Sequence, residues 1–414
     1  MKQVFILQNS YISFGLDAKL IYQKDKYDLF LIVNQFGYDI VKNKNQQRYY
    51  KKIIITNDFS VETIKNTINS LRDEKADFNI ITNSEETMPV CGIIRVLMGI
   101  DKNDYSRFYD KDAMKKALSK SNAIKIPKYK LYNASQFQTL REGYLDELTA
   151  DMRYPLFIKP VTLYGSMSLT KINDRTDLHK WAITTSPDTL YEIDEFIDGT
   201  MYHCDSYIKN QEILFTFISK NSRPCYNFTV GEMKGTIVLP ENHPDTTLLT
   251  RITEQALTGI GMPDSGVTHM ELIKTKDDQI YFIEIAHRAP GCLIPNMYKE
   301  HANIDTVASH YLLQIDAEYH PKPDRKTYAA WACFPKKPGV ITKLKRPPNN
   351  LTSTIDISWV YRVGDVIKTY SKFGRDYTGT IFLTNPNFES LLSDFIRIND
   401  NNLCDIMALD EHSF

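Results

Sequence analysis

Two glutamates are the residues of this 414-residue sequence whose types and spacing best fit chemistry. Two β-prone runs flank the turn-forming pair Asp277-Asp278, and Glu271 and Glu284 each belong to one run. An antiparallel hairpin about this turn pairs Lys276 with Gln279. The same register, continued away from the turn, places Glu271 opposite Glu284. A loop of odd length would break the pairing and leave both glutamates as solvated hairpin charges.

Directly opposed strand residues have Cβ atoms about 4.5–5.5 Å apart, and like charges at such positions repel. A shared proton would relieve the repulsion. A divalent cation would also relieve it, since such ions favour oxygen ligands and substrate phosphates. Side chains alternate along a strand, so we expect Ala286 and Arg288 on the same face as the glutamates. The hairpin therefore predicts one surface with two carboxylates and a guanidinium.

Lys159 ends an apolar segment, Tyr154-Pro-Leu-Phe-Ile-Lys159-Pro160, that is typical of a buried strand. A lysine in such a position seldom lacks a partner. Gly165 and Ser166 follow in a loop whose amides and hydroxyls could approach an anion. With one glycine the loop by itself fits an ordinary hairpin connection equally well.

Residues 191–199, Tyr-Glu-Ile-Asp-Glu-Phe-Ile-Asp-Gly, predict a strand that runs into a glycine turn. Its backbone carbonyl and N–H groups could bind an adenine. Taken alone, the segment is equally a strand end with surface acids.

The order of these segments resembles the ATP-grasp superfamily over roughly residues 100–315. The resemblance rests on Asp110-Lys111, YPLFIKP with its Gly-Ser loop, DEFIDG, YHCDSYI, HMEL and FIEIAHRAPG. The pattern of Glu284, Arg288 and Gly291 is similar to that of the carboxylate-amine ligases, a branch that includes ligases joining amino acids into dipeptides. The resemblance implies an N-terminal open parallel α/β domain, an ATP-grasp fold and a small C-terminal α+β appendix.

The resemblance also implies roles for residues that bind ATP. Lys111 and Lys159 match the two lysines that contact the nucleotide phosphates, and Ser166 matches the mobile flap over them. A hinge that binds adenine is matched by Asp194, Glu195 and Ile197, the last two through backbone groups.

Metal and substrate roles follow from the same resemblance. Glu271 and Glu284 match ligands of Mg²⁺, with Mn²⁺ as an alternative ion. Arg288 matches the arginine that steadies the acyl phosphate or the tetrahedral intermediate, and Gly291 follows it at the substrate end. Arg223 could clamp a substrate carboxylate by bidentate hydrogen bonds. A solvated loop arginine is the simpler interpretation of Arg223.

Two departures from the family pattern concern ligands. Ala286 stands where the family often has an asparagine that binds metal. Met201 stands where the family usually has a glutamate that binds ribose. Asp205 or His203 could contact the ribose instead.

The activity implied is an ATP-dependent amide or peptide ligation through an acyl phosphate, with release of ADP and phosphate. Small-molecule carboxylates and amines would be the substrates, an amino acid or small carboxylic acid among them. Two alternatives stay open. One is another ATP-grasp reaction, phosphoryl transfer or carboxylation, and the other is a nucleotide-binding module without turnover.

The elements that must position these residues follow from hydrophobic patterning. In the first third, short apolar runs alternate with amphipathic stretches, which is typical of a parallel sheet with crossover helices. We expect three units: an α/β domain at 1–100, the ATP-grasp domain at 101–315 and an α+β subdomain at 316–414. Expected strands are 4–7, 29–33, 53–56, 78–81, 128–132, 156–159, 168–172, 190–196, 202–208, 213–218, 329–334 and 380–383. Expected helices are 60–71, 86–98, 110–118, 246–260, 304–313 and 388–398.

Composition excludes several partner classes. The sequence has 50 Lys and Arg against 51 Asp and Glu, so no overall field favours nucleic acid or an acidic membrane surface. We find no apolar run long enough to span a bilayer and no signal peptide. The six cysteines form no CxxC pair, which favours a reduced, cytoplasmic setting. The resemblance is compatible with a homodimer.

Overall fold

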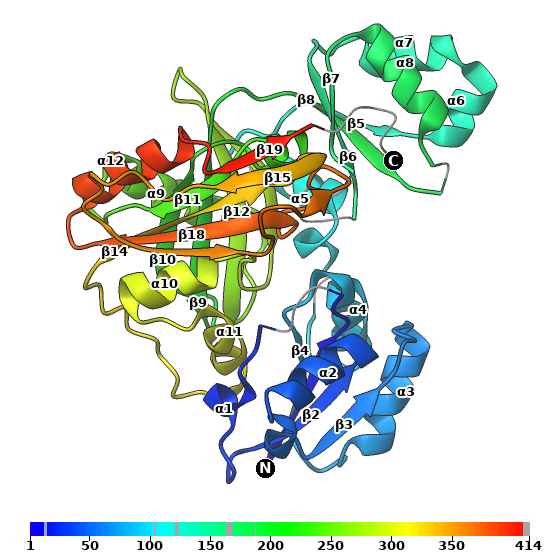
Figure 1. Ribbon diagram of the computed structural model, residues 1–414. Coiled ribbons are helices and arrows are strands. Elements are labelled where there is room, and N and C mark those ends of the chain that lie inside the picture. Colours follow the sequence, from blue (N-terminus) through cyan, green and yellow to red (C-terminus); the bar gives the residue numbers. More distant parts are fainter. Residues whose placement is uncertain (12–14, 103–104, 121–123, 163–167, 187, 409–414) are drawn as a thin grey trace.

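The computed structural model describes residues 1–11, 15–102, 105–120, 124–162, 168–186 and 188–408. The described residues form four sheets. Figure 1 shows the three larger ones as a parallel α/β unit at the bottom, a small antiparallel unit at the upper right and a large sheet at the left. The mixed α/β class expected from the sequence is confirmed. Among the described residues, no helix combines the length and apolar character needed to cross a bilayer.

The first unit is a four-stranded parallel sheet with helices on both faces. Its strands, in spatial order, are β3 (Lys52–Ile55), β2 (Tyr27–Val33), β1 (Lys2–Gln8) and β4 (Phe78–Thr82). Its helices are α1 (Ala18–Ile21), α2 (Gln35–Asn43), α3 (Val61–Leu71) and α4 (Met88–Leu97), with 3-10 turns at Gln47–Tyr49 and Glu85–Thr87. Ser60 caps α3 by accepting from the Thr63 N–H, as its side-chain chemistry predicts.

A second, antiparallel sheet carries Lys159 and the hinge segment. Its strands, in spatial order, are β5 (Tyr129–Tyr132), β8 (Tyr191–Glu195), β6 (Leu156–Pro160) and β7 (Thr170–Ile172). Helices α6 (Ala134–Leu140), α7 (Glu142–Thr149) and α8 (Arg175–Thr184) lie beside it, and the last two pack on it through apolar residues such as Leu145 and Leu178. The sequence predicted these strands but not the three helices.

The third and largest sheet has eight strands. In spatial order they are β13 (Ile280–Ala286), β12 (Gly266–Lys274), β9 (Thr200–Lys209), β10 (Glu212–Asn221), β11 (Lys234–Val238), β14 (Tyr328–Pro335), β18 (Tyr377–Asn385) and β16 (Thr354–Trp359). A 3-10 helix, Cys225–Val230, precedes β11, and a separate small sheet contains β17 (Val366–Ile367), β15 (Gly339–Leu344) and β19 (Cys404–Met407). The boundary that we propose at residue 315 falls before β14, and the large sheet continues across it.

The two faces of the large sheet bury different side chains. One face packs on α9 (Pro244–Ile260), α12 (Phe388–Asn399) and α5 (Lys111–Ser119), which a 3-10 turn at Ser106–Phe108 precedes. The other packs on α10 (Ile294–Ala302) and α11 (Thr306–Ile315). Met270 and Leu272 of β12 belong to the first core. Alternation along β12 therefore turns His269 and Glu271 toward the α10 side.

Helix α11 joins the parallel unit to the large sheet. Its Val307, Tyr311 and Ile315 belong to the core on one face of the parallel sheet, and Leu313 belongs to the core under the large sheet. Two polar contacts reinforce the junction, since His310 Nε2 lies 3.1 Å from the Thr82 carbonyl and Asn79 donates to the Gln314 carbonyl at 3.0 Å. The parallel sheet and the hairpin strand β12 are thus held against the same helix.

The hairpin confirms the predicted glutamate pair but not the predicted turn. Glu271 pairs with Glu284, whereas Lys274 pairs with Ile280 and the Thr275 N–H donates to the Gln279 carbonyl. The predicted pairing of Lys276 with Gln279 is wrong, because the loop is one residue longer than assumed. A β-bulge between Glu271 and Leu272 compensates for the extra residue and restores the predicted register at the glutamates.

A buried network of four charges fixes α5 to the second sheet. Lys115 is fully buried, and its Nζ lies 2.8 Å from Glu192 Oε1 and 2.7 Å from Asp194 Oδ1. Lys159 Nζ lies 2.7 Å from the other oxygen of Asp194 and 3.3 Å from Glu192 Oε1. Burial and the charge of Lys159 lower the pKa of Lys115, against the opposing effect of both carboxylates.

We predict that Lys115→Met destabilises the protein by about 3 kcal/mol, because removing one partner leaves an uncompensated buried carboxylate. Urea denaturation followed by circular dichroism measures the effect. Lys116→Met is the matched control on the same helix, since Lys116 is exposed and its ion pair is with Asp112 on the helix surface. The control should unfold with the wild-type protein, and equal stability of both variants would contradict the buried network.

Candidate functional site

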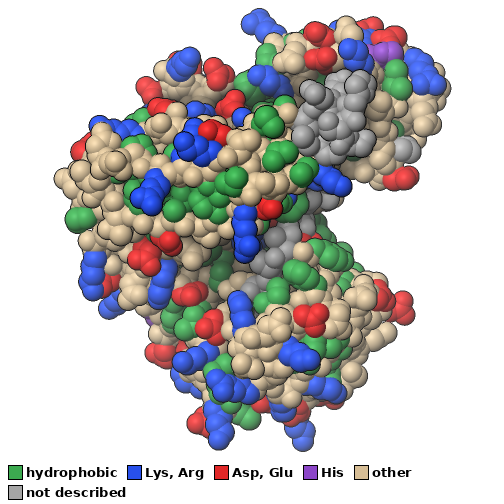
Figure 2. Space-filling model, in the orientation of Figure 1, with side chains coloured by type: hydrophobic (Ala, Val, Ile, Leu, Met, Phe, Trp, Pro, Cys, Tyr) green, Lys and Arg blue, Asp and Glu red, His purple; other side chains and the backbone are tan. Residues whose placement is uncertain are grey.

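A cavity of about 620 Å³ lies where the three units meet. Figure 2 shows the molecule hollowed between the parallel unit, at the bottom, and the parts above it. Most of the residues predicted for the site line this cavity: Lys111, Lys159, Asp194, Glu195, Ile197, Glu271, Glu284, Arg288 and Gly291. Segments more than 150 residues apart in the sequence thus supply one continuous surface.

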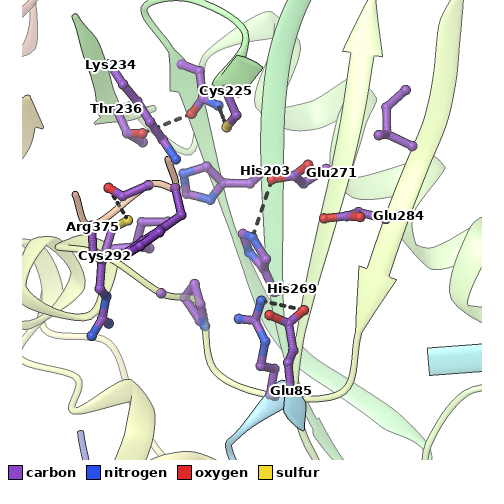
Figure 3. Close-up of a pocket in the computed structure, with 18 of the residues that line it drawn as sticks. Glu85, His203, Cys225, Lys234, Thr236, His269, Glu271, Glu284, Cys292 and Arg375 are labelled. Atoms are coloured by element: carbon purple, nitrogen blue, oxygen red, sulfur yellow. Dashed lines mark hydrogen bonds and ion pairs between the residues drawn. The ribbon is translucent and has the colours of Figure 1, made fainter. Parts of the chain in front are cut away.

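Glu271 and Glu284 lie side by side on β12 and β13 and face the cavity (Figure 3). Their side chains are only 17% and 28% exposed. Burial and the neighbouring charge of Glu284 raise the pKa of Glu271 to about 8. Burial acts in the same direction on Glu284, but Lys111 and Lys159 outweigh it and hold the pKa of Glu284 below its ordinary value. The negative charge of the pair is therefore not fully balanced by its neighbours, and one more positive charge would stabilise it.

Lys111 and Lys159 lie on the Glu284 side of the pair. Lys111 Nζ is 3.4 Å from Glu284 Oε2, and both lysine side chains are about 5% exposed. Burial acts to lower the pKa of Lys159, but Asp194 and Glu192 outweigh burial and raise it. Lys159 is therefore charged at neutral pH, and both side chains are suited to a phosphate chain.

The hinge follows the end of β8, an inner strand of the second sheet. The Glu195 N–H donates to the Lys128 carbonyl, and the Glu195 carboxylate accepts from the Lys128 N–H at 2.9 Å. Asp194 is buried in the charge network, so it supports Lys159 rather than facing a base. Glu195 and Ile197 line the cavity, and their backbone contact with adenine stays a prediction.

An ion pair with Glu85 of the parallel unit holds Arg288 in place. Its Nη2 lies 3.0 Å from Glu85 Oε1, and its Nη1 donates to the Ala289 carbonyl at 2.8 Å. Burial raises the pKa of Glu85, although the Arg288 guanidinium opposes this shift. Glu85 was not predicted, because nothing in the sequence distinguishes it from its neighbour Glu86 between a strand and a helix.

Asp205 lies under the cavity wall as the centre of a hydrogen-bonded cluster. It is fully buried and accepts from His203 Nδ1 at 2.7 Å, His269 Nδ1 at 2.6 Å and the Tyr298 hydroxyl at 2.5 Å. The two histidines hold the pKa of Asp205 well below its ordinary value despite burial. Asp205 does not line the cavity, so the structure does not bring its carboxylate to the other site residues, and the ribose contact stays a prediction. His203, the other residue suggested, does line the cavity.

Two groups in the site have ligand sets that fit a cation. His203, Asp205 and His269 bring one nitrogen or oxygen each within 4.8 Å of one another. Both Nδ1 atoms are already engaged with Asp205, and His203 Nε2 is buried without a hydrogen-bond partner among the described residues. Glu271 and Glu284 are the better fit for Mg²⁺, because their oxygens face the cavity and repel each other.

Two predicted residues fall outside this arrangement. Arg223 is held by Glu232 at 3.3 Å and donates to the Asn399 carbonyl at 3.2 Å, and it does not line the cavity. The structure therefore does not bring Arg223 to the other site residues. Ser166 and Gly165 lie outside the described residues.

The sequence also missed Lys115, Glu192 and Lys234, which lies on the unpredicted strand β11. A signal existed for Glu192, which alternates with Asp194 on a strand and so shares its face. The signal for Lys115 in the sequence is a charged residue at a helix position that the spacing of the apolar residues predicts to be buried.

Comparison with known proteins agrees with the geometry. Residues 152–296 match the ATP-grasp domain family. The chain is 23% identical over 247 residues to the L-arginine-specific L-amino acid ligase of Bacillus subtilis, covering 56% of this chain and 59% of that protein. It is 23% identical over 217 residues to the D-alanine–D-alanine ligase of Natranaerobius thermophilus, covering 51% and 58%. The chain thus spans less than two thirds of the curated relatives it matches.

Solved structures match over nearly the whole chain. The L-amino acid ligase of Bacillus licheniformis superimposes with a TM-score of 0.68 at 17% identity and covers 99% of both chains. The N5-carboxyaminoimidazole ribonucleotide synthetase of Thermotoga maritima gives a TM-score of 0.61 at 13% identity, covering 99% of this chain and 100% of the other. Residues 152–296 are therefore an ATP-grasp domain, and the whole chain has the fold of these ligase and synthetase structures.

Proposed function

We propose that this protein is an ATP-dependent ligase that joins a small carboxylate, such as an amino acid, to an amine. The observation that carries the proposal is the opposed pair Glu271 and Glu284 in a cavity shared with two buried lysines and Arg288. The relatives at modest identity include L-amino acid and D-alanine ligases, which supports the same reaction class.

ATP would lie between the second sheet and the glutamate pair. Lys111 and Lys159 would bind its phosphates, while the backbone of Glu195 and Ile197 would bind adenine. Asp194 would act through Lys159 by fixing its ammonium. A flap containing Ser166 over the phosphates stays a prediction.

Glu271 and Glu284 would hold Mg²⁺, or Mn²⁺. The fit rests on two carboxylates that repel each other at paired strand positions and on the raised pKa of Glu271. When bound, the ion would neutralise charge on the transferring phosphoryl group. A third protein ligand is not supplied by Ala286, so waters or phosphate oxygens would complete the coordination.

Two bond exchanges make up the reaction. A substrate carboxylate oxygen attacks the γ-phosphorus of ATP, the β–γ bridging P–O bond breaks, and ADP leaves. The amine nitrogen then attacks the acyl phosphate carbon, phosphate leaves, and the amine loses a proton as the amide forms. Arg288 would stabilise the oxyanion of this second step, held in place by Glu85.

The cellular compartment and the oligomeric state of the protein are also proposals. The free cysteines, Cys91, Cys204, Cys225, Cys292, Cys333 and Cys404, fit the reduced cytoplasm that we propose. A homodimer stays a prediction that no contact in a single chain tests.

We predict that Glu284→Gln lowers the rate of ADP and phosphate release at least about 100-fold, because it removes half of the metal-binding pair. A coupled assay with ATP, Mg²⁺ and a panel of amino acids measures it, and product analysis separates ligation from phosphoryl transfer or carboxylation. Glu254→Gln, at an exposed position of α9, is the control and should keep full activity. Undiminished turnover in Glu284→Gln would contradict the assignment of Glu284 as a metal ligand.

The affinity for Mn²⁺ should depend on pH. Glu271 has its pKa raised to about 8, so it binds a proton below pH 8 that the ion must displace. We predict that affinity falls about tenfold per pH unit from pH 8 to pH 6 and is constant above pH 8. Electron paramagnetic resonance titration measures free Mn²⁺, and Glu271→Gln is expected to bind weakly without this slope. A flat profile for the wild-type protein would contradict the shift.

A further inference from the structure

His269 is a buried histidine whose second ring nitrogen faces the glutamate pair. Its side chain is 10% exposed, and it lines the cavity together with Glu271 and Glu284. His269 Nε2 lies 3.8 Å from Glu271 Oε1, and Figure 3 shows the two side chains next to each other. This separation is too long for a hydrogen bond. Among the residues that the structure describes, Nε2 has no hydrogen-bond partner, and the proposed reaction gives it no role.

Asp205 fixes both the proton and the orientation of this ring. The His269 Nδ1–H donates to Asp205 at 2.6 Å, so the free lone pair of the neutral ring is on Nε2. Asp205 also accepts from His203 and from the Tyr298 hydroxyl, which holds the carboxylate in turn. Histidines that bind metal ions commonly donate their other ring N–H to a carboxylate, and this bond orients the ligand nitrogen. His269 therefore has the hydrogen bond that a metal ligand needs.

The distance between His269 Nε2 and Glu271 fits two ligands of one ion. Ligand atoms about 2.1 Å from an ion can lie up to about 4.2 Å apart. The observed 3.8 Å is within this limit without any rotation of the imidazole. An ion such as Mg²⁺ takes about six ligands, and the two glutamates supply two when each binds through one oxygen. A nitrogen beside Glu271 can therefore enter a position that water would otherwise fill.

The residue opposite His269 leaves space beside the glutamates. His269 pairs with Ala286 across β12 and β13, and the alanine methyl group has no atom that can bind a metal. Both residues line a small cavity of about 20 Å³ that also reaches Glu284. A cavity of this size can hold about one water molecule. The space between the imidazole and Glu284 is thus open to a small ligand.

His203 shares the bond to Asp205 but not the approach to the glutamates. Its Nδ1 lies 2.7 Å from Asp205, and the residue pairs with Glu271 across β9 and β12. Among the described residues, Asp205 is the one carboxylate within 4.0 Å of its ring nitrogens. The two histidines therefore differ in where Nε2 lies, and His203 provides a matched control.

We infer that His269 Nε2 binds the metal ion together with Glu271 and Glu284, and that this nitrogen makes the site favour Mn²⁺ over Mg²⁺. Mg²⁺ favours oxygen ligands, whereas imidazole is a common ligand of first-row transition ions. The inference rests on the proposed function, because the same two glutamates hold the ion. It adds a third protein ligand and a preference between the two ions.

Pulsed electron paramagnetic resonance of the full chain loaded with Mn²⁺ tests the inference. An ATP analogue with a methylene group between its β- and γ-phosphorus atoms is added, because it is not cleaved and brings no nitrogen to the phosphates. The wild-type spectrum should show the ¹⁴N coupling of a bound imidazole, and protein labelled with ¹⁵N-histidine should show ¹⁵N coupling instead. This comparison needs no substitution, so it does not depend on the folding of a variant.

His269→Asn removes the ligand nitrogen but keeps a donor for Asp205, because the asparagine amide stands near the position of Nδ1. This variant should lose the nitrogen coupling and bind Mn²⁺ about 10- to 100-fold more weakly. Competition titrations should show a smaller preference for Mn²⁺ over Mg²⁺. His203→Asn should keep the coupling and most of the Mn²⁺ affinity, and thermal unfolding should show that both variants are folded.

Four results would overturn the inference: no binding of Mn²⁺, no nitrogen coupling in the wild-type protein, coupling that persists in His269→Asn, or coupling lost equally in His203→Asn. The test needs no turnover. Mn²⁺ bound with coupling from His269, but without ADP formation for any substrate pair, would contradict the proposed function alone. Ligation that depends on Glu284 but shows no nitrogen coupling would contradict this inference alone.

Discussion

Repulsion between Glu271 and Glu284 is the constraint on which the rest of the site depends. Two unit charges 4 Å apart repel by about 4 kcal/mol at the effective dielectric of a protein surface. The pair is held together by strand register, and cations from three parts of the chain surround it. Lys111 and Lys159 act on Glu284, Lys234 acts on Glu271, and Arg288 acts on both. Burial and the charge of Glu284 keep the pKa of Glu271 raised despite these cations, which supports the metal ion that we propose for the pair.

The sequence predicted the parts of this arrangement that depend on local pattern. Alternating apolar runs located the strands of the parallel sheet and the hairpin, and Ser60 marked the start of α3. The glutamate pairing was also predicted, although through a turn that is one residue too short. The predicted pairing is correct only because of the β-bulge. No residue type in the hairpin predicts that bulge.

The remainder depends on contacts between distant segments. Lys115 stands at a buried position of α5, but its partners Glu192 and Asp194 come from the distant strand β8. Glu85 and Arg288 are 203 residues apart and meet because α11 holds the parallel unit against the large sheet. The sequence suggested Asp205 as a substitute for the usual ribose-binding glutamate. Its three donors come from β9, β12 and α10, and only the assembled sheet shows that they occupy it.

Asp205 also explains how the cavity wall keeps its shape beside two repelling carboxylates. His203 is paired with Glu271 across β9 and β12, and His269 is two residues before Glu271 on the same face. Both imidazoles donate Nδ1–H to Asp205, so their rings cannot rotate toward the cavity without breaking a bond to a buried charge. Breaking such a bond costs more than an ordinary hydrogen bond, because the carboxylate has no water to replace it. Glu271 therefore rests on a rigid wall, and its position is set by packing and hydrogen bonds rather than by the ion it would bind.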